Sequence, residues 1–140
     1  MSKYICGIWL FIVGFGCNTS SDMVEVLNGS NTYSFYSRMS TDGLVAVGIR
    51  DMRTRNLIAE FVTDASYYQK FSLRWISSTM ILLKSSDVGY RVITVGAECR
   101  MYFAIVNDEC DGILEILLTT EEGEAISRVK VRKDELAQGR

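Results

Sequence analysis

Short apolar stretches separated by turn residues recur along most of this chain, and their lengths predict β-strands rather than helices. Residues 44–49 form a continuous apolar run rich in β-branched side chains, which is typical of a strand buried on both faces. Residues 71–76 alternate apolar and polar side chains, so Trp75 is expected in the core. Residues 80–83 are a second strand that is apolar on both faces.

The predicted strands are spaced as repeats of three. Residues 35–55 align without gaps with residues 71–91 at an offset of 36, and a fainter third copy follows at an offset of 69. The third copy predicts strands at 101–106, 113–118 and 126–131, and a helix over 124–137 is the alternative for the last of them. Three-strand repeats joined by tight turns predict an antiparallel meander.

Residues 71–95 (FSLRWISSTMILLKSSDVGYRVITV) resemble one blade of a TolB-type β-propeller repeat, in which strands alternate with short Ser/Asp turns. A closed propeller needs at least four blades of four strands, and this chain is too short to supply them. We therefore predict an all-β fold, an antiparallel meander of three-strand units. The meander should form a small β-sandwich or a curled open sheet, and not a closed propeller.

The first 22 residues follow a different pattern. Lys3 is the only charged residue before Asp22, and residues 5–13 are an apolar core that is short for a membrane span. A positive start, a short apolar core and small residues at its exit are typical of a secretory signal peptide.

Residues 13–17 (VGFGC) resemble the lipobox of bacterial lipoproteins, in which a small residue precedes a lipid-carrying cysteine. The resemblance implies cleavage after Gly16 and a diacylglycerol group, with acyl chains such as palmitate, on Cys17. An ordinary signal peptide and an uncleaved anchor are the alternatives. In this family an aspartate after the cysteine favours the inner membrane. Asn18 in that place favours the outer membrane, with the domain facing the periplasm.

We expect four segments in the chain. They are a signal peptide over 1–16, a lipidated tether over 17–31, an all-β domain over 32–133 and a tail over 134–140. The tether is polar except at residues 23–27, where one short strand is expected before the turn at Asn28.

The composition bears on several classes of function. Histidine is absent, which removes the commonest general base and the commonest metal ligand, so we predict neither a metal nor a cofactor. Lys and Arg number 15 against 17 Asp and Glu, so there is no basic excess to attract nucleic acid. Carboxylates are numerous, but no pair of them marks a glycosidase site.

The four cysteines separate into two groups. Cys6 lies in the signal peptide, and Cys17 is the predicted lipid carrier. Cys99 and Cys110 remain, an even pair in a compartment that permits disulfides. We predict a disulfide between these two residues, and two buried free thiols are the alternative.

Two charged pairs occupy the same position in successive repeats, Asp51 with Arg55 and Asp87 with Arg91. We interpret them as ion pairs across turns, and a binding surface repeated on successive hairpins is the alternative.

Tyr67 and Tyr68 fall in a predicted connection between strands. Aromatic side chains contribute strongly to protein–protein binding, so these two tyrosines are the predicted partner-binding residues.

These features together predict a non-enzymatic function. The protein is expected to be an envelope-anchored lipoprotein that binds a protein or glycan partner, for example as an inhibitor or immunity-type protein. One alternative is a carboxylate-dependent hydrolase of envelope polysaccharide. Another is a structural subunit of an envelope complex, in which exposed strand edges pair with other chains.

Overall fold

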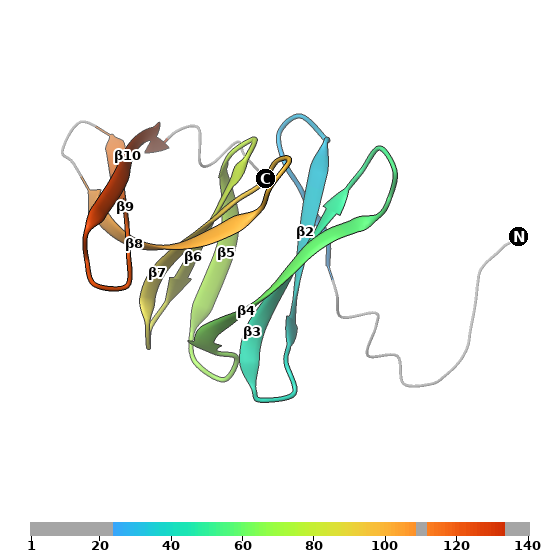
Figure 1. Cartoon of the computed structure of the whole chain (residues 1–140), viewed down its shortest axis with the longest axis horizontal. Coiled ribbons are helices and arrows are strands. Elements are labelled where there is room, and N and C mark those ends of the chain that lie inside the picture. The colour runs from blue at the N-terminus through green and yellow to red at the C-terminus, as the bar shows by residue number, and fades with distance from the viewer. Residues whose placement is uncertain (1–23, 109–111, 134–140) are drawn as a thin grey trace, which may run out of the picture.

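Ten antiparallel strands make up most of the part of the chain that the computed structural model describes, residues 24–108 and 112–133. They form a four-stranded sheet in the order β1-β2-β3-β4 and a six-stranded sheet in the order β10-β9-β8-β7-β6-β5 (Figure 1). The first sheet consists of β1 (Val26–Leu27), β2 (Tyr33–Met39), β3 (Leu44–Asp51) and β4 (Leu57–Ser66). The second consists of β5 (Phe71–Ser77), β6 (Met80–Ser85), β7 (Gly89–Thr94), β8 (Arg100–Asp108), β9 (Ile113–Thr119) and β10 (Ala125–Arg132).

The predicted fold class is confirmed, because two antiparallel sheets form without closing into a propeller. The three predicted units correspond to β2–β4, β5–β7 and β8–β10. The alternative helix is wrong over residues 125–132, which form β10, and residues 134–137 lie outside the described residues. In β10 Val129 and Val131 alternate with charged residues, and they pair with Ile116 and Leu114 of β9.

The first hydrophobic core lies between the two sheets. Phe35, Val47 and Ile49 of the four-stranded sheet pack against Trp75 and Leu83 of the six-stranded sheet. Val47 and Ile49 alternate along β3 and are both fully buried, as expected for a strand in the middle of its sheet. This core makes the fold a β-sandwich.

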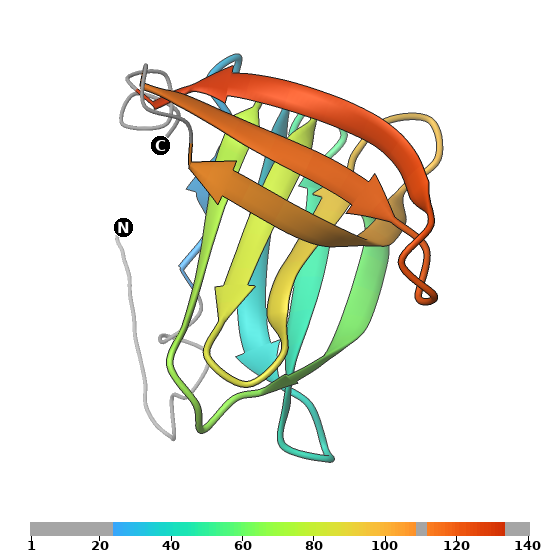
Figure 2. The same ribbon diagram turned by 90° about the vertical axis from the view of Figure 1, so that its left-hand side faces the viewer.

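A second core lies on the opposite face of β5–β7. There Leu82 of β6 and Val92 of β7 pack in one cluster with Ile116 and Leu118 of β9. The six-stranded sheet must therefore curl back over itself, and Figure 2 shows β8–β10 crossing β5–β7 at a steep angle. As a result β5–β7 form a middle layer with an apolar core on each face (Figure 1).

The short strand predicted before the turn at Asn28 is confirmed as β1, which pairs with β2. The indole N–H of Trp75 donates to the carbonyl oxygen of Val26 at 2.9 Å. The Asn28 side chain is buried and donates to the carbonyl oxygen of Ser78 at 2.7 Å. The last part of the predicted tether is therefore attached to the six-stranded sheet.

Candidate functional site

The predicted cysteine chemistry falls largely outside the part of the chain that is described. Cys17 and Cys110 both lie there, and so does the signal peptide over 1–16. Cys99 is partly buried and packs against the first core, and no other cysteine lies within the described residues. The Cys99–Cys110 disulfide therefore stays a prediction.

The two predicted binding tyrosines lie in the turn between β4 and β5. The Tyr68 side chain is 77% exposed and that of Tyr67 is 36% exposed. The Tyr67 N–H donates to the carbonyl oxygen of Gly43 at 2.9 Å, and its ring lies 5.4 Å from that of Phe71, centroid to centroid. The structure thus confirms the exposure that was expected of a connection. We call Tyr67 and Tyr68 the tyrosine surface.

The tyrosine surface rests on the turn between β2 and β3. Gly43 in that turn has a φ of 79°, and a Cβ atom there would lie 3.3 Å from Cε2 of Tyr68. Only glycine adopts this backbone conformation readily and leaves room for the ring. Met39, the last residue of β2, is 44% exposed and adds apolar area near the same turn. Contacts with the fold therefore support both tyrosines.

A second surface feature is a cleft of about 370 Å³ between the middle layer and the curled part of the six-stranded sheet. We call it the basic cleft. Its lining residues are Ser72, Arg74, Leu82, Lys84, Tyr90, Val106, Asp108, Leu114 and Lys133. Three of these side chains are cationic, and the one carboxylate, Asp108, forms an ion pair with Lys133.

Sequence reasoning missed the basic cleft. Arg74 lies in a predicted strand and Lys84 follows one directly. From the sequence alone, their charged side chains indicate a face exposed to solvent. The cleft exists because β8 and β9 fold over that face and bring Val106 and Leu114 opposite the two cations. The one sequence feature that indicates the cleft is the presence of Arg74 and Lys84 in strands that are otherwise largely apolar.

The predicted ion pairs across turns are wrong. Arg91 pairs with Asp64 of β4, 27 residues away in the chain, with its Nη2 2.6 Å from Oδ2. Asp87 instead accepts hydrogen bonds from the Ser85 hydroxyl and the Ser66 N–H, and these bonds lower its pKa. The side chain of Asp51 pairs with Arg53, at 3.8 Å, instead of Arg55.

Arg91 connects the two sheets. Its side chain is 8% exposed, and Nη1 donates to the carbonyl oxygens of Val88 at 3.0 Å and Tyr90 at 2.8 Å. Its guanidinium carbon lies 4.0 Å from the centroid of the Phe103 ring, at a favourable distance for a cation–π contact. Nε, Nη1 and Nη2 of Arg91 all donate hydrogen bonds within the protein, so this residue stabilises the fold and is not available to bind a ligand.

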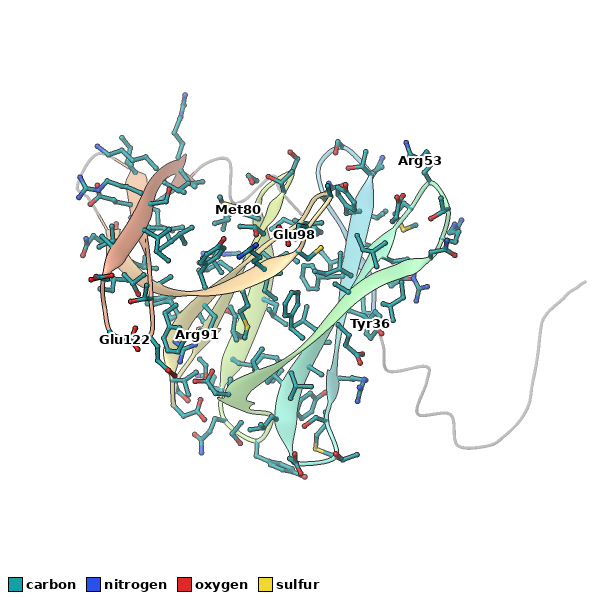
Figure 3. The ribbon with its side chains drawn as sticks, in the orientation of Figure 1. Tyr36, Arg53, Met80, Arg91, Glu98 and Glu122 are labelled. Atoms are coloured by element: carbon teal, nitrogen blue, oxygen red, sulfur yellow. The ribbon has the colours of Figure 1, made fainter. Side chains whose placement is uncertain are left out.

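The outer face of the four-stranded sheet carries a network of charged side chains. Arg38 contacts Glu60 with Nε and Nη2, at 3.0 and 2.9 Å, and the Tyr36 hydroxyl donates to the same carboxylate at 3.1 Å. The Tyr36 ring crosses β3 at Gly48, where a Cβ atom would lie 2.2 Å from its Cζ. Figure 3 labels Tyr36 in this sheet, and Arg91 near β7.

These contacts shift the titration of the groups involved. The hydrogen bond from Arg38 lowers the pKa of Glu60, and the hydrogen bond from the Ser34 hydroxyl lowers the pKa of Glu25. Burial, followed by the contact with Glu60, raises the pKa of Tyr36. Each of these side chains is hydrogen-bonded to another side chain of the network. We therefore interpret the network as one that stabilises the four-stranded sheet.

We expect this network to make the domain sensitive to acid. The pKa of Glu60 lies below its ordinary value of 4.5 in the folded protein, so its stabilising effect is complete above that pH. The effect is lost as the pH falls through the lowered pKa. The Glu60→Gln variant should therefore be less stable than the wild type at pH 7, and the difference should shrink as the pH falls below 4.5 and through the lowered pKa, as measured by urea unfolding.

The matched control is Glu98→Gln, because the Glu98 side chain is 73% exposed and pairs with an exposed arginine. Water screens such a pair, so this variant should follow the wild type at every pH. A constant difference between wild type and Glu60→Gln across the pH range would contradict the assignment.

The described residues contain no group of three or more Cys, Asp or Glu side chains that could hold a metal ion. Within the same residues no helix has the length and apolar character to cross a membrane. The alternative function, a carboxylate-dependent hydrolase, would need two facing carboxylates; among the described residues that line the basic cleft, Asp108 is the one carboxylate.

Comparison with known proteins adds no functional assignment. No protein family, no curated protein sequence and no solved structure matches this chain.

Proposed function

We propose that this protein is a non-enzymatic binding module of the bacterial cell envelope, anchored through lipid on Cys17. The proposal places it on the outer membrane facing the periplasm. The main supporting observation is the exposed tyrosine surface, whose two rings contact Phe71 and Gly43. Tyrosine is enriched at binding hot spots because it provides a large contact area together with a polar tip.

The geometry of the tyrosine surface favours a protein partner. Ordering a mobile side chain on binding costs about 0.5–1.5 kcal/mol, so contacts that already hold a ring lower this cost. The ring of Tyr67 is held by Phe71, and that of Tyr68 lies on Gly43. An inhibitor or immunity-type protein would use such a surface to block its target, and a glycan partner is the alternative.

The test is photo-crosslinking in living cells of the source organism. A photoreactive phenylalanine analogue replaces Tyr68 in the full-length precursor, and irradiation should give one discrete protein adduct. The control carries the same analogue at Ile126, which is 51% exposed on β10. Equal labelling from both positions, or no protein adduct from position 68, would contradict a specific protein-binding surface there.

The anchor is tested by the Cys17→Ser variant. Without the thiol there is no acceptor for diacylglycerol, so incorporation of labelled palmitate should fall to background. The domain should then appear in the soluble periplasm, or the precursor should stay uncleaved. If the variant incorporated palmitate and fractionated with membranes as the wild type does, the lipoprotein hypothesis would be wrong. Cys6→Ser is the matched control, because it removes a thiol that is not the predicted lipid carrier.

The disulfide is tested on protein from the periplasm, alkylated without reductant. We expect neither Cys99 nor Cys110 to be modified, as measured by intact mass. A crosslink that closes a loop of about a dozen residues contributes roughly 3 kcal/mol in the chain-entropy model, so reduction should lower the melting temperature. Alkylation of both thiols in the native protein would refute the bridge.

A second candidate function is that of a structural subunit in an envelope complex. The observation that favours it is the edge strand β4, where Leu57, Ile58 and Val62 are 48%, 41% and 52% exposed. Within the described residues no strand pairs with the outer side of β4. Such an edge can pair with a strand of another chain. Adducts from a photoreactive residue at position 62, with none from position 68, would favour this second function.

A further inference from the structure

We propose that the basic cleft binds the oxyanion group, carboxylate or phosphate, of a small organic ligand. Three features lead to this proposal: the register of the cleft floor, an excess of positive charge without partners, and an apolar wall. The cleft is separate from the tyrosine surface, so the proposal does not rest on the function proposed above.

The floor of the cleft is fixed by strand register. Ser72 of β5 pairs with Lys84 of β6, and Lys84 pairs with Tyr90 of β7. Neighbouring strands lie about 4.8 Å apart, so a hydroxyl, an ammonium and a phenol stand side by side on one face. Arg74 follows two positions after Ser72 on the same face. All four side chains therefore line the same face of the sheet, and each carries a hydrogen-bond donor at the cleft.

The charges on this floor are not compensated. Arg74 and Lys84 are exposed and make no hydrogen bond or ion pair within the described part of the chain. Arg74 pairs with Leu82, which places Lys84 diagonally across from it, at a distance where like charges repel. In contrast, Arg38, Arg50, Arg91 and Arg128 all contact carboxylates. A bound anion would relieve this repulsion.

The remaining walls set the size and character of the ligand. The cleft volume of about 370 Å³ is at the small end of the range for small-molecule sites, roughly 300–1,000 Å³. Val106 of β8 and Leu114 of β9 provide an apolar wall opposite the cations, and Leu82 lies on the floor beside Arg74. A guanidinium group binds a carboxylate or phosphate through two parallel hydrogen bonds. The fitting ligand thus has one oxyanion and a compact body, of about one sugar ring.

The positive surface continues beyond the cleft. An adjoining hollow shares Ser72 and Lys84 and adds Lys70 to its lining. This arrangement draws anions toward the cleft from the side of the β4–β5 turn, because clustered charge raises the local anion concentration.

The experiment is a titration of the isotope-labelled full-length protein in a non-ionic detergent, in which amide chemical shifts report binding. The probes are inorganic phosphate, glucuronate as an acidic sugar and glycerol 3-phosphate as a lipid headgroup, with glucose as the neutral control. We expect at least one anion, and not glucose, to shift Ser72, Lys84 and Tyr90. Glucuronate binding would identify a carboxylate source, and binding of either phosphate would identify a phosphate source.

Variants show whether the cleft itself is responsible. Arg74→Gln and Lys84→Gln should each weaken binding by about tenfold or more, the effect of losing one charge-assisted hydrogen bond. Neither cation has a partner among the described residues, so both variants should melt no lower than the wild type in the absence of anion. Arg128→Gln removes the same charge outside the cleft, and binding should stay within about twofold.

Two results would overturn the proposal. One is the absence of shifts in the cleft at about 10 mM of every anion, above the millimolar range of weak specific binding. The other is an equal loss of affinity in Lys84→Gln and Arg128→Gln, which would mean general charge attraction. Either result leaves the tyrosine surface untouched, because its test uses crosslinking from position 68.

Discussion

Replacing Val47 by aspartate is expected to unfold the domain. Val47 is fully buried on β3, where it pairs with Ser37 and Phe61 and faces the first core. An unpaired carboxylate in this place costs several kcal/mol, against a total stability of roughly 5–15 kcal/mol for a domain of this size. The far-ultraviolet circular dichroism spectrum and the urea unfolding curve of the variant measure the effect.

The matched control for this variant is Val62→Asp. Val62 lies on β4 in the same sheet, but its side chain is 52% exposed, so the same substitution leaves the carboxylate in water. We expect a change of at most about 0.5 kcal/mol in the free energy of unfolding. Equal stability of the Val47→Asp and Val62→Asp variants would show that the first core is not where the structure places it.

The second large effect is expected for Trp75→Ala. The Trp75 side chain is 1% exposed, and its ring lies 5.6 Å from that of Phe35 on the facing sheet. Truncation of a buried tryptophan costs about 3–5 kcal/mol because it removes apolar contacts and leaves a cavity. Urea unfolding should show this loss, and hydrogen exchange should show faster exchange in β1, which the indole N–H holds through Val26.

A second variant separates the cavity from the hydrogen bond. Trp75→Phe keeps an aromatic ring in the core but leaves the carbonyl oxygen of Val26 without its donor. We expect this variant to lose about 1–3 kcal/mol, with exchange in β1 increased as in the alanine variant. Unchanged exchange in β1 in both variants would contradict the attachment of β1 through Trp75.

Most of the strands could be predicted because their signals are local. The continuous apolar run at 44–49 and the alternation at 71–76 reflect the two-residue period of a strand, which no distant contact needs to supply. The repeat register placed the third unit correctly even where its own pattern was weak, as in β10.

The charged residues could not be assigned in the same way. Arg91 and Asp87 lie close in sequence, and a turn between them made a pair plausible. In the folded chain, however, Arg91 lies on the core side of β7, where Asp64 of the facing sheet reaches it. Long side chains take their partners from whichever element packs against their face, and a local pattern carries no information about that element.

The sequence by itself determined the all-β class, the three-strand units, the buried strands β3 and β6 and the exposure of Tyr67 and Tyr68. Strand periodicity and turn residues act over a few positions, so they can be read without knowing the fold. Only the tertiary structure decided that the six-stranded sheet curls back over β5–β7. The curl forms because the apolar side chains of β9 pack on the face of β6 that carries Leu82. These contacts join residues far apart in the chain, so no local pattern predicts them. The basic cleft exists because of that packing, since the curl places an apolar wall opposite Arg74 and Lys84.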